Sequence, residues 1–473
     1  MSDTASALTP SPDMMPAPFG VTMTGETHPP LDENDLAVIA GIDPAEVKAR
    51  AKPEGHLAIV PTIDAKDLSD AGWGIVFPAN IDPAIKKALQ PLIELRQKQA
   101  TGPNRFRIFE GNNKGVKPGQ SATDWLERQG VGLAVVDPDN GVPYYLLLVG
   151  SPADISFEFQ YTLDLQWCVG RLSFDTPAEY ESYARSVVDY ETSKSVPHKK
   201  RAAMWMTQNT GDVATSMLTN QVGRPIAAQG LGSKKGYQLT SFMGPQASKQ
   251  QLSDILSGKL PDGPPALLFT GSHGMEWAMS DVAGQRASQG ALVTQEWSPG
   301  RQIGDDCLFR GADVPADAKV HGLVHFLFAC FGGGCPTTDT YRKGPNGAEI
   351  PIAAAPMIAR LPQTLLAKGA LAVMAHVDRA WSWSFQTGTG LPQNQIMRST
   401  MDAMLLGLRA GMALDFFNLQ WSTMAARLGM LQGGAAAPTA AALANLMIAR
   451  DDARNYALFG DPAVRLRVED MAA

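Results

Sequence analysis

Nearly continuous apolar runs constrain the fold of this chain more than any other feature, because each is short and ends near glycine or a reactive residue. Three examples are Tyr144–Gly150, Ala266–Thr270 and Leu323–Ala329. Strands that are buried on both faces of a parallel sheet have this composition, whereas strands with one wet face alternate. Segments with helical spacing separate the runs, such as Tyr180–Val188 and Ala354–Lys368. The pattern predicts an α/β fold with a mostly parallel sheet and helices on both faces.

Two such alternating series follow one another along the chain. The basic, polar stretch Ser193–Arg201 lies between them and is typical of a linker. We therefore predict two tandem subdomains, at residues 51–195 and 200–473. Residues 1–50 carry many Pro, Asp and Thr with little periodicity, which predicts a partly ordered N-terminal tail.

The charge and apolar content exclude several classes of function. A net charge of −7 gives no basic footprint for nucleic acid or for an anionic membrane surface. No window reaches the roughly 18 apolar residues that a membrane span needs. Residues 1–20 lack the basic and then apolar order of a signal peptide, so we expect a cytoplasmic protein. The four cysteines are too few for a disulfide scaffold and leave a thiol nucleophile open.

Two of the predicted strands lead into residues that are able to hydrolyse an amide. The run Ala266–Thr270 leads to His273, and the run Leu323–Ala329 leads to Cys330. Sites in open α/β sheets lie beyond the carboxyl ends of the strands. Adjacent parallel strands would therefore bring the two side chains to one edge, although 330 − 273 = 57 positions separate them. A thiolate can attack a carbonyl carbon while an imidazole protonates the leaving amine.

Gly274 follows the histidine and leaves its backbone N–H free to face a developing oxyanion, with the N–H of Cys330 as a second donor.

Other interpretations of these residues stay open at this point. A buried cysteine is usually a small core residue, and a His-Gly pair is a common turn. Cys330 and Cys335 would be half of a metal site, but no second Cys/His pair lies nearby, so we expect neither metal nor cofactor.

Around these residues the sequence resembles the caspase-like clan of cysteine peptidases. Thr270–Gly274 is similar to the histidine motif of the clan, and Phe328–Gly333 is similar to its "Ala-Cys-x-x-Gly" motif. The segment Leu366–Trp381 is similar to the helix, strand and substrate loop that follow the cysteine in gingipain-type and CHAT-type members.

Further segments resemble the gingipain family in particular. Leu146–Gly150 with Val169–Leu172 resembles its non-catalytic first subdomain, and Val188–Glu191 is similar to the end of the helix that closes it. Leu458–Pro462 resembles the "Phe-Gly-Asp-Pro" near the end of its peptidase domain. The segments occur in the expected order over residues 55–470. The gingipain family is thus the nearest match, with CHAT-domain peptidases next.

The resemblance implies a role for each matched residue. His273 matches the general acid/base and Cys330 the nucleophile, and the N–H groups of Gly274 and Cys330 match the oxyanion hole. The indoles of Trp381 and Trp383 would wall the primary specificity pocket.

A carboxylate that pairs with a basic substrate side chain is implied as well. Asp164 and Asp378 are the two candidates, and for each the alternative is a solvated loop carboxylate. The polar region Gln295–Asp317 is an insertion relative to the family pattern, and would serve as a lid, a regulatory flap or a processing site.

The sequence therefore predicts a cysteine endopeptidase that acts on protein or peptide substrates, with basic residues before the cut as one option. One alternative is a catalytically silent caspase-like scaffold for binding or signalling. Another is a latent enzyme that a partner or ligand activates, as in bacterial stress or defence systems.

Overall fold

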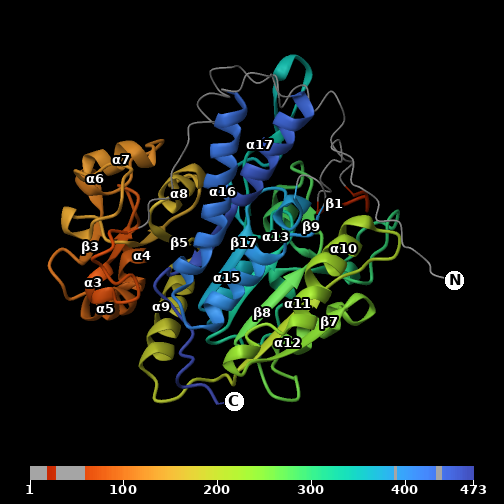
Figure 1. The fold of residues 1–473 in the computed structure, drawn as a ribbon, viewed down its shortest axis with the longest axis horizontal. Coiled ribbons are helices and arrows are strands. Elements are labelled where there is room, and N and C mark those ends of the chain that lie inside the picture. Colours follow the sequence, from red (N-terminus) through yellow and green to blue (C-terminus); the bar gives the residue numbers. More distant parts are fainter. Residues whose placement is uncertain (1–18, 28–58, 388–390, 433–438, 473) are drawn as a thin grey trace.

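The computed structural model describes residues 19–27, 59–387, 391–432 and 439–472 (Figure 1). Ten strands form one central sheet in the order β3-β2-β4-β5-β18-β17-β12-β8-β6-β7. In chain order they are β2 (Trp73–Val76), β3 (Phe106–Phe109), β4 (Tyr145–Val149), β5 (Cys168–Leu172), β6 (Arg201–Met206), β7 (Gln238–Met243), β8 (Leu267–Gly271), β12 (Val324–Phe328), β17 (Ala372–His376) and β18 (Tyr456–Gly460). The predicted α/β class with a mostly parallel sheet is confirmed.

One antiparallel contact, between β17 and β18, divides the sheet into two sets of strands. All other neighbours are parallel, so β3, β2, β4, β5 and β18 run one way and the remaining five strands run the other way. Strands from residues 51–195 and from residues 200–473 thus share a single sheet. The strand that joins them is β18, which comes from the end of the chain and lies beside β5.

Helices connect the strands, and they pack against one another in two groups. In the first part of the chain α5 and α4 pack on α9, which α14 also contacts. In the second part α16 packs on β5 and β18, with α15 and α17 against it, as Figure 1 shows. The bounds are α3 (Leu68–Ala71), α4 (Pro83–Ala88), α5 (Gln90–Gln99), α6 (Gly111–Lys114), α7 (Ala122–Arg128), α8 (Phe157–Asp164), α9 (Pro177–Thr192), α10 (Val213–Leu218), α11 (Arg224–Gln229), α12 (Lys249–Leu256), α13 (Val282–Ser288), α14 (Arg360–Ala367), α15 (Gln395–Leu405), α16 (Ala410–Gln432) and α17 (Ala440–Arg454). None of the described helices is long and apolar enough to cross a membrane.

A second, small sheet stands beyond the end of β8. Its strands are β1 (Gly20–Thr22), β9 (Gly274–Glu276), β10 (Leu292–Val293) and β11 (Leu308–Phe309), in the order β1-β9-β10-β11. Val21, Met275 and Trp297 share its separate buried cluster. Residues 19–27 are therefore built into the fold, and part of the inserted region 295–317 connects two strands of this sheet.

The helix expected over Ala354–Lys368 is shorter than the sequence predicts, because α14 begins only at Arg360. The residues before it form β16 (Met357–Ile358), which pairs with β13 (Gly334–Cys335) in the loop after Cys330. Pro356 disfavours a helical conformation for the residue that precedes it, so the helix starts after the proline.

Candidate active site

Three neighbouring strands of the central sheet end at one level and lead into the candidate residues. Met206 of β6 and Phe328 of β12 both pair with Gly271 of β8. The chain beyond β8 carries His273, and the chain beyond β12 carries Cys330. The expected adjacency of these two strands is thus present, with both residues at the same edge of the sheet.

The imidazole of His273 is held by Asp212, which follows β6. Its Nε2 atom lies 3.0 Å from Oδ2 of Asp212, and both side chains are buried. Asp212 also caps α10, accepting hydrogen bonds from the backbone N–H and the hydroxyl of Thr215 at 2.8 and 2.6 Å. Burial acts to raise the pKa of Asp212, but His273 and Thr215 outweigh it and lower the pKa to about 2. Asp212 therefore stays ionised and fixes the ring orientation.

The thiol of Cys330 is fully buried, at 0 % exposure. Its Sγ accepts from the N–H of Ala380 at 3.3 Å and donates to the carbonyl of Ala380 at 3.6 Å. Burial raises the pKa of this thiol despite the nearby Arg379 guanidinium. The next residue, Phe331, has φ of 56° and donates its N–H to the carbonyl of Asp378. This ties the turn after Cys330 to the loop that follows β17.

Two backbone N–H groups converge on one carbonyl oxygen beside the thiol. Gly274 and Cys330 donate to the oxygen of Phe19 at 3.0 and 3.2 Å, and the N–H of Phe19 donates to the carbonyl of Ala380 at 3.1 Å. The two donors lie so close that a Cβ on Gly274 would sit 1.8 Å from the carbonyl oxygen of Cys330. Only glycine permits this approach. The expected pair of oxyanion donors thus binds a peptide carbonyl.

Aromatic rings surround the two residues at the centre of this arrangement. The ring of Phe19 lies 4.9 Å from that of Phe328, 5.7 Å from that of Phe385 and 5.9 Å from that of His273. Trp297, from the inserted region, packs edge-on against His273 at 5.6 Å.

The structure places the indoles of Trp381 and Trp383 elsewhere. Both are buried in a small second core together with Tyr341, Leu428 and Met447. The backbone of their loop still lines the site through Ala380, but these indoles are not among the rings that contact Phe19.

Asp378 lies in the same loop, with its carboxylate already engaged. It accepts hydrogen bonds from the Thr340 hydroxyl and the N–H of Arg379. Burial raises its pKa to about 6, against the opposing effect of the Arg379 guanidinium.

The structure does not bring Asp164 together with the dyad. Asp164 is the last residue of α8, and burial raises its pKa well above the usual range, with Asp415 adding to the effect. It precedes β5, which β18 and β17 separate from β12. Its carboxylate makes no hydrogen bond or ion pair with His273 or Cys330 among the described residues.

Sequence reasoning missed Asp212, Phe19 and Phe385. Asp212 had a usable signal, because it follows the apolar run Ala202–Met206 much as His273 and Cys330 follow theirs. Phe19 had none, since its hydrogen bonds are made by the backbone and it lies in a stretch without periodicity. Within the described residues no group of three or more His, Cys, Asp or Glu side chains is placed to hold a metal ion.

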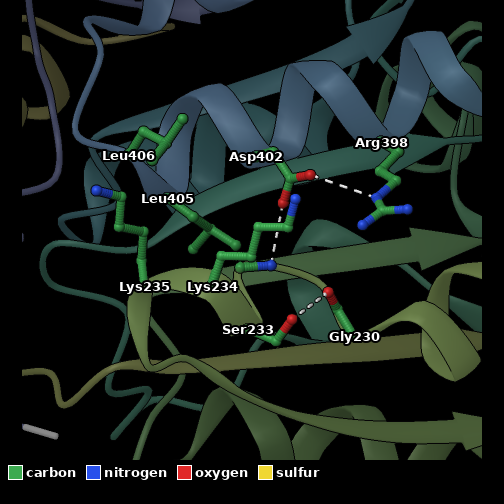
Figure 2. Close-up of a pocket in the computed structure, with 9 residues that line it drawn as sticks. Gly230, Ser233, Lys234, Lys235, Arg398, Asp402, Leu405 and Leu406 are labelled. Carbon is green, nitrogen blue, oxygen red and sulfur yellow. Dashed lines mark hydrogen bonds and ion pairs between the residues drawn. The ribbon is translucent and has the colours of Figure 1, made fainter.

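A separate surface pocket lies between α15 and the turn at residues 230–235 (Figure 2). Asp402 bridges its two sides there, since it pairs with Arg398 at 3.4 Å and accepts from the N–H of Gly232 at 3.0 Å. None of the dyad, oxyanion or Phe19 contacts described above involves its lining, so this pocket is distinct from the candidate active site.

Comparisons with known proteins found a matching family and similar solved structures. The model of peptidase family C25 matches residues 119–467. Similar solved structures include the Arg-specific cysteine proteinase gingipain R (RgpB), at 12% identity over 86% of this chain and 80% of that chain, with a TM-score of 0.47. The complex of Porphyromonas gingivalis RgpB pro- and mature domains is similar at 13% identity over 84% and 80%, with a TM-score of 0.45. No curated protein sequence matches the chain. Since the family match covers most of the sequence, the resemblance to gingipains is confirmed: the chain belongs to peptidase family C25 and is a cysteine peptidase.

Proposed function

We propose that this protein is a cysteine endopeptidase in which Cys330 is the nucleophile, His273 the general acid/base and Asp212 the residue that positions the imidazole. One observation carries the proposal. The N–H groups of Gly274 and Cys330 both bind a single peptide carbonyl oxygen, that of Phe19, beside the thiol. This is the arrangement that stabilises the oxyanion of an acyl-transfer intermediate.

The chemistry follows from these positions. The Cys330 thiolate adds to the substrate carbonyl carbon, and the oxyanion that forms is held by the two N–H groups. His273 receives the thiol proton and passes it to the leaving amine, which departs as the new N-terminus of the product. Water then hydrolyses the thioester and restores the thiol. Asp212 keeps its charge throughout and stabilises the imidazolium form of His273.

A preference for basic residues is the option that the resemblance implies. It would require a free carboxylate beside the position of Phe19. Asp378 is bound to Thr340 and Arg379, and Asp164 precedes β5, which β18 and β17 separate from β12, so neither supports that preference. We therefore propose the peptidase activity without a basic specificity.

Latency is part of the proposal. Both His273 and Cys330 have 0 % exposure, and Phe19 contacts both, through its carbonyl oxygen to the N–H of Cys330 and through its ring to His273. A substrate can reach the thiol only after this segment is displaced or removed, by a partner, a ligand or cleavage. The same burial favours one alternative, a silent scaffold in which Phe19 fills the site permanently.

The test is peptide cleavage by the whole protein with a mixed fluorogenic peptide library. We expect Cys330→Ala to abolish cleavage and to keep the melting temperature near that of the wild type. Cys168→Ala is the matched control, because it removes another buried thiol, in β5, and should keep activity. Cleavage by Cys330→Ala at the wild-type rate would contradict the nucleophile assignment. A wild type that neither cleaves peptides nor reacts with peptidyl chloromethyl ketones would favour the scaffold.

A further inference from the structure

The segment around Phe19 lies in the site as a peptide substrate would. Its backbone makes three hydrogen bonds there: its carbonyl oxygen accepts from Gly274 and Cys330, and its N–H donates to Ala380. One residue is thus fixed on both sides of its Cα, with its carbonyl turned to the oxyanion donors. A substrate residue just before the scissile bond needs these same contacts.

The chain beyond Phe19 is held as well. Gly20 begins β1, which pairs in parallel with β9, and Figure 1 shows these two strands side by side. Val21 is fully buried in the core of the small sheet. Further on, Ile303 of the inserted region donates its N–H to the carbonyl of Met23 at 3.4 Å. The insertion therefore retains the segment on the leaving-group side of the Phe19–Gly20 bond.

The pocket that receives the Phe19 side chain is aromatic. The ring has 0 % exposure and contacts the rings of Phe328, Phe385 and His273. These neighbours offer favourable edge-to-face packing to another ring but no carboxylate to a cation. A lysine or arginine side chain in the same place would lose its hydration, and the carboxylate beside these rings, that of Asp212, is already bound to His273 and Thr215, so the exchange is unfavourable.

We propose that Phe19–Gly20 is a self-cleavage site, and that the enzyme cuts its substrates after aromatic residues. The inference rests on the proposed function, because it uses the same nucleophile. It names the substrate class and the first bond to be cut.

The step balances with water as the co-reactant. Sγ of Cys330 forms a bond to the carbonyl carbon of Phe19, and the thiol proton passes to His273, whose Nδ1 atom has no hydrogen-bond partner among the described residues. That proton moves to the nitrogen of Gly20 as the C–N bond breaks, which leaves residues 1–19 as a thioester on Cys330. Water adds to the thioester, its hydroxyl forms the carboxylate of Phe19, and a proton returns to sulfur. Release of residues 1–19 then opens the site.

Incubation of the purified full chain tests self-cleavage by intact mass and N-terminal analysis. We expect the wild type to yield a chain that begins at Gly20, and Cys330→Ala to remain whole. Phe19→Tyr should retain cleavage at this bond, because the ring is kept, whereas Phe19→Lys should slow it at least tenfold. An active wild type in which the Phe19–Gly20 bond stays intact, or one that cuts itself elsewhere, would overturn the self-cleavage.

Peptides added in trans separate this inference from the proposed function and do not depend on the folding of a Phe19 variant. A matched pair that differs only in Phe or Arg before the cut is used, with the corresponding chloromethyl ketones. Cleavage at least tenfold faster after Phe supports the inference. Cleavage after Arg but not after Phe would overturn the aromatic preference and leave the peptidase proposal standing. No cleavage and no labelling of Cys330 by either probe would contradict both.

Discussion

The Nε2 atom of His273 lies 3.0 Å from Oδ2 of Asp212, although 61 positions separate the two residues in the sequence. The contact exists because β6 and β8 are parallel neighbours that end at the same level. A carboxylate in this position orients the imidazole and stabilises its protonated form. In the proposed mechanism Asp212 is therefore a positioning residue for His273.

Asp212→Asn should lower kcat by about 10²-fold with little change in KM, because the proton transfer loses its oriented base. Asparagine still caps α10, so the fold should persist. The pH profile of kcat should shift as well, since the imidazolium loses its partner. Asp281→Asn is the matched control: Asp281 caps α13 through the N–H of Gly284 and lies outside the site. An unchanged pH profile in Asp212→Asn would count against the positioning role.

The contact between Asp212 and His273 also predicts that the folded protein loses stability in acid. The pKa of Asp212 is lowered from 3.8 to about 2 in the folded state. A lowered folded pKa stabilises the fold above the unfolded value, and this contribution disappears as the pH falls through the folded value. The wild type should therefore lose about 2 kcal/mol relative to Asp212→Asn between about pH 4 and 2. Denaturant unfolding of both proteins across this range measures the effect, and a constant difference would contradict it.

A buried network joins the end of the chain to elements from its first part. Asp461, in the "Phe-Gly-Asp-Pro" segment after β18, accepts from Nε of Arg96 at 2.7 Å and from the indole of Trp73 at 2.9 Å. The guanidinium of Arg96 also binds Glu191 through two hydrogen bonds of 2.7 Å. This motif therefore contributes to the fold, by tying the end of the chain to β2, α5 and α9.

Asp461→Ala should lower the free energy of unfolding by about 3 kcal/mol, because Arg96 stays buried with one partner lost. The control is Asp470→Ala, whose ion pair with Arg467 lies near the surface and should contribute less than about 1 kcal/mol. Denaturant unfolding compares the two variants. Equal, small losses of unfolding free energy in both variants would show that the network contributes little to the stability of the fold.

The placement of the dyad was predictable because it depends on local sequence signals. The apolar runs before His273 and Cys330 identify buried parallel strands, and residues beyond such strands lie at one edge of the sheet. Asp212 lies beyond β6 in the same way, so the same rule identifies it as a candidate site residue. Gly274 was predictable too, because a close backbone approach beside the histidine requires the smallest residue.

The direction of β18, the burial of the two indoles and the position of Phe19 depend on packing between residues far apart in the sequence, which no local sequence pattern indicates. The direction of β18 follows from the way α15, α16 and α17 return the chain to the sheet. Side chains of α16 and α17 also form the core that buries Trp381 and Trp383, which the sequence suggests as pocket walls. Phe19 reaches the site through backbone hydrogen bonds, and these carry no signature in residue type.

Asp378 gives a prediction of the opposite sign to that for Asp212. Its folded pKa is raised to about 6, mainly by burial, whereas an unfolded carboxyl has a value of 3.8. A raised folded value means that ionisation destabilises the fold, progressively from about pH 4 to about pH 6. Asparagine cannot ionise, and it tolerates the left-handed φ of 75° found at this position. Relative to Asp378→Asn, the wild type should therefore lose about 2–3 kcal/mol as the pH rises through this window. Denaturant unfolding at pH 4 and pH 7 measures the difference. A pH-independent difference would mean that Asp378 ionises in the folded protein as easily as in the unfolded chain.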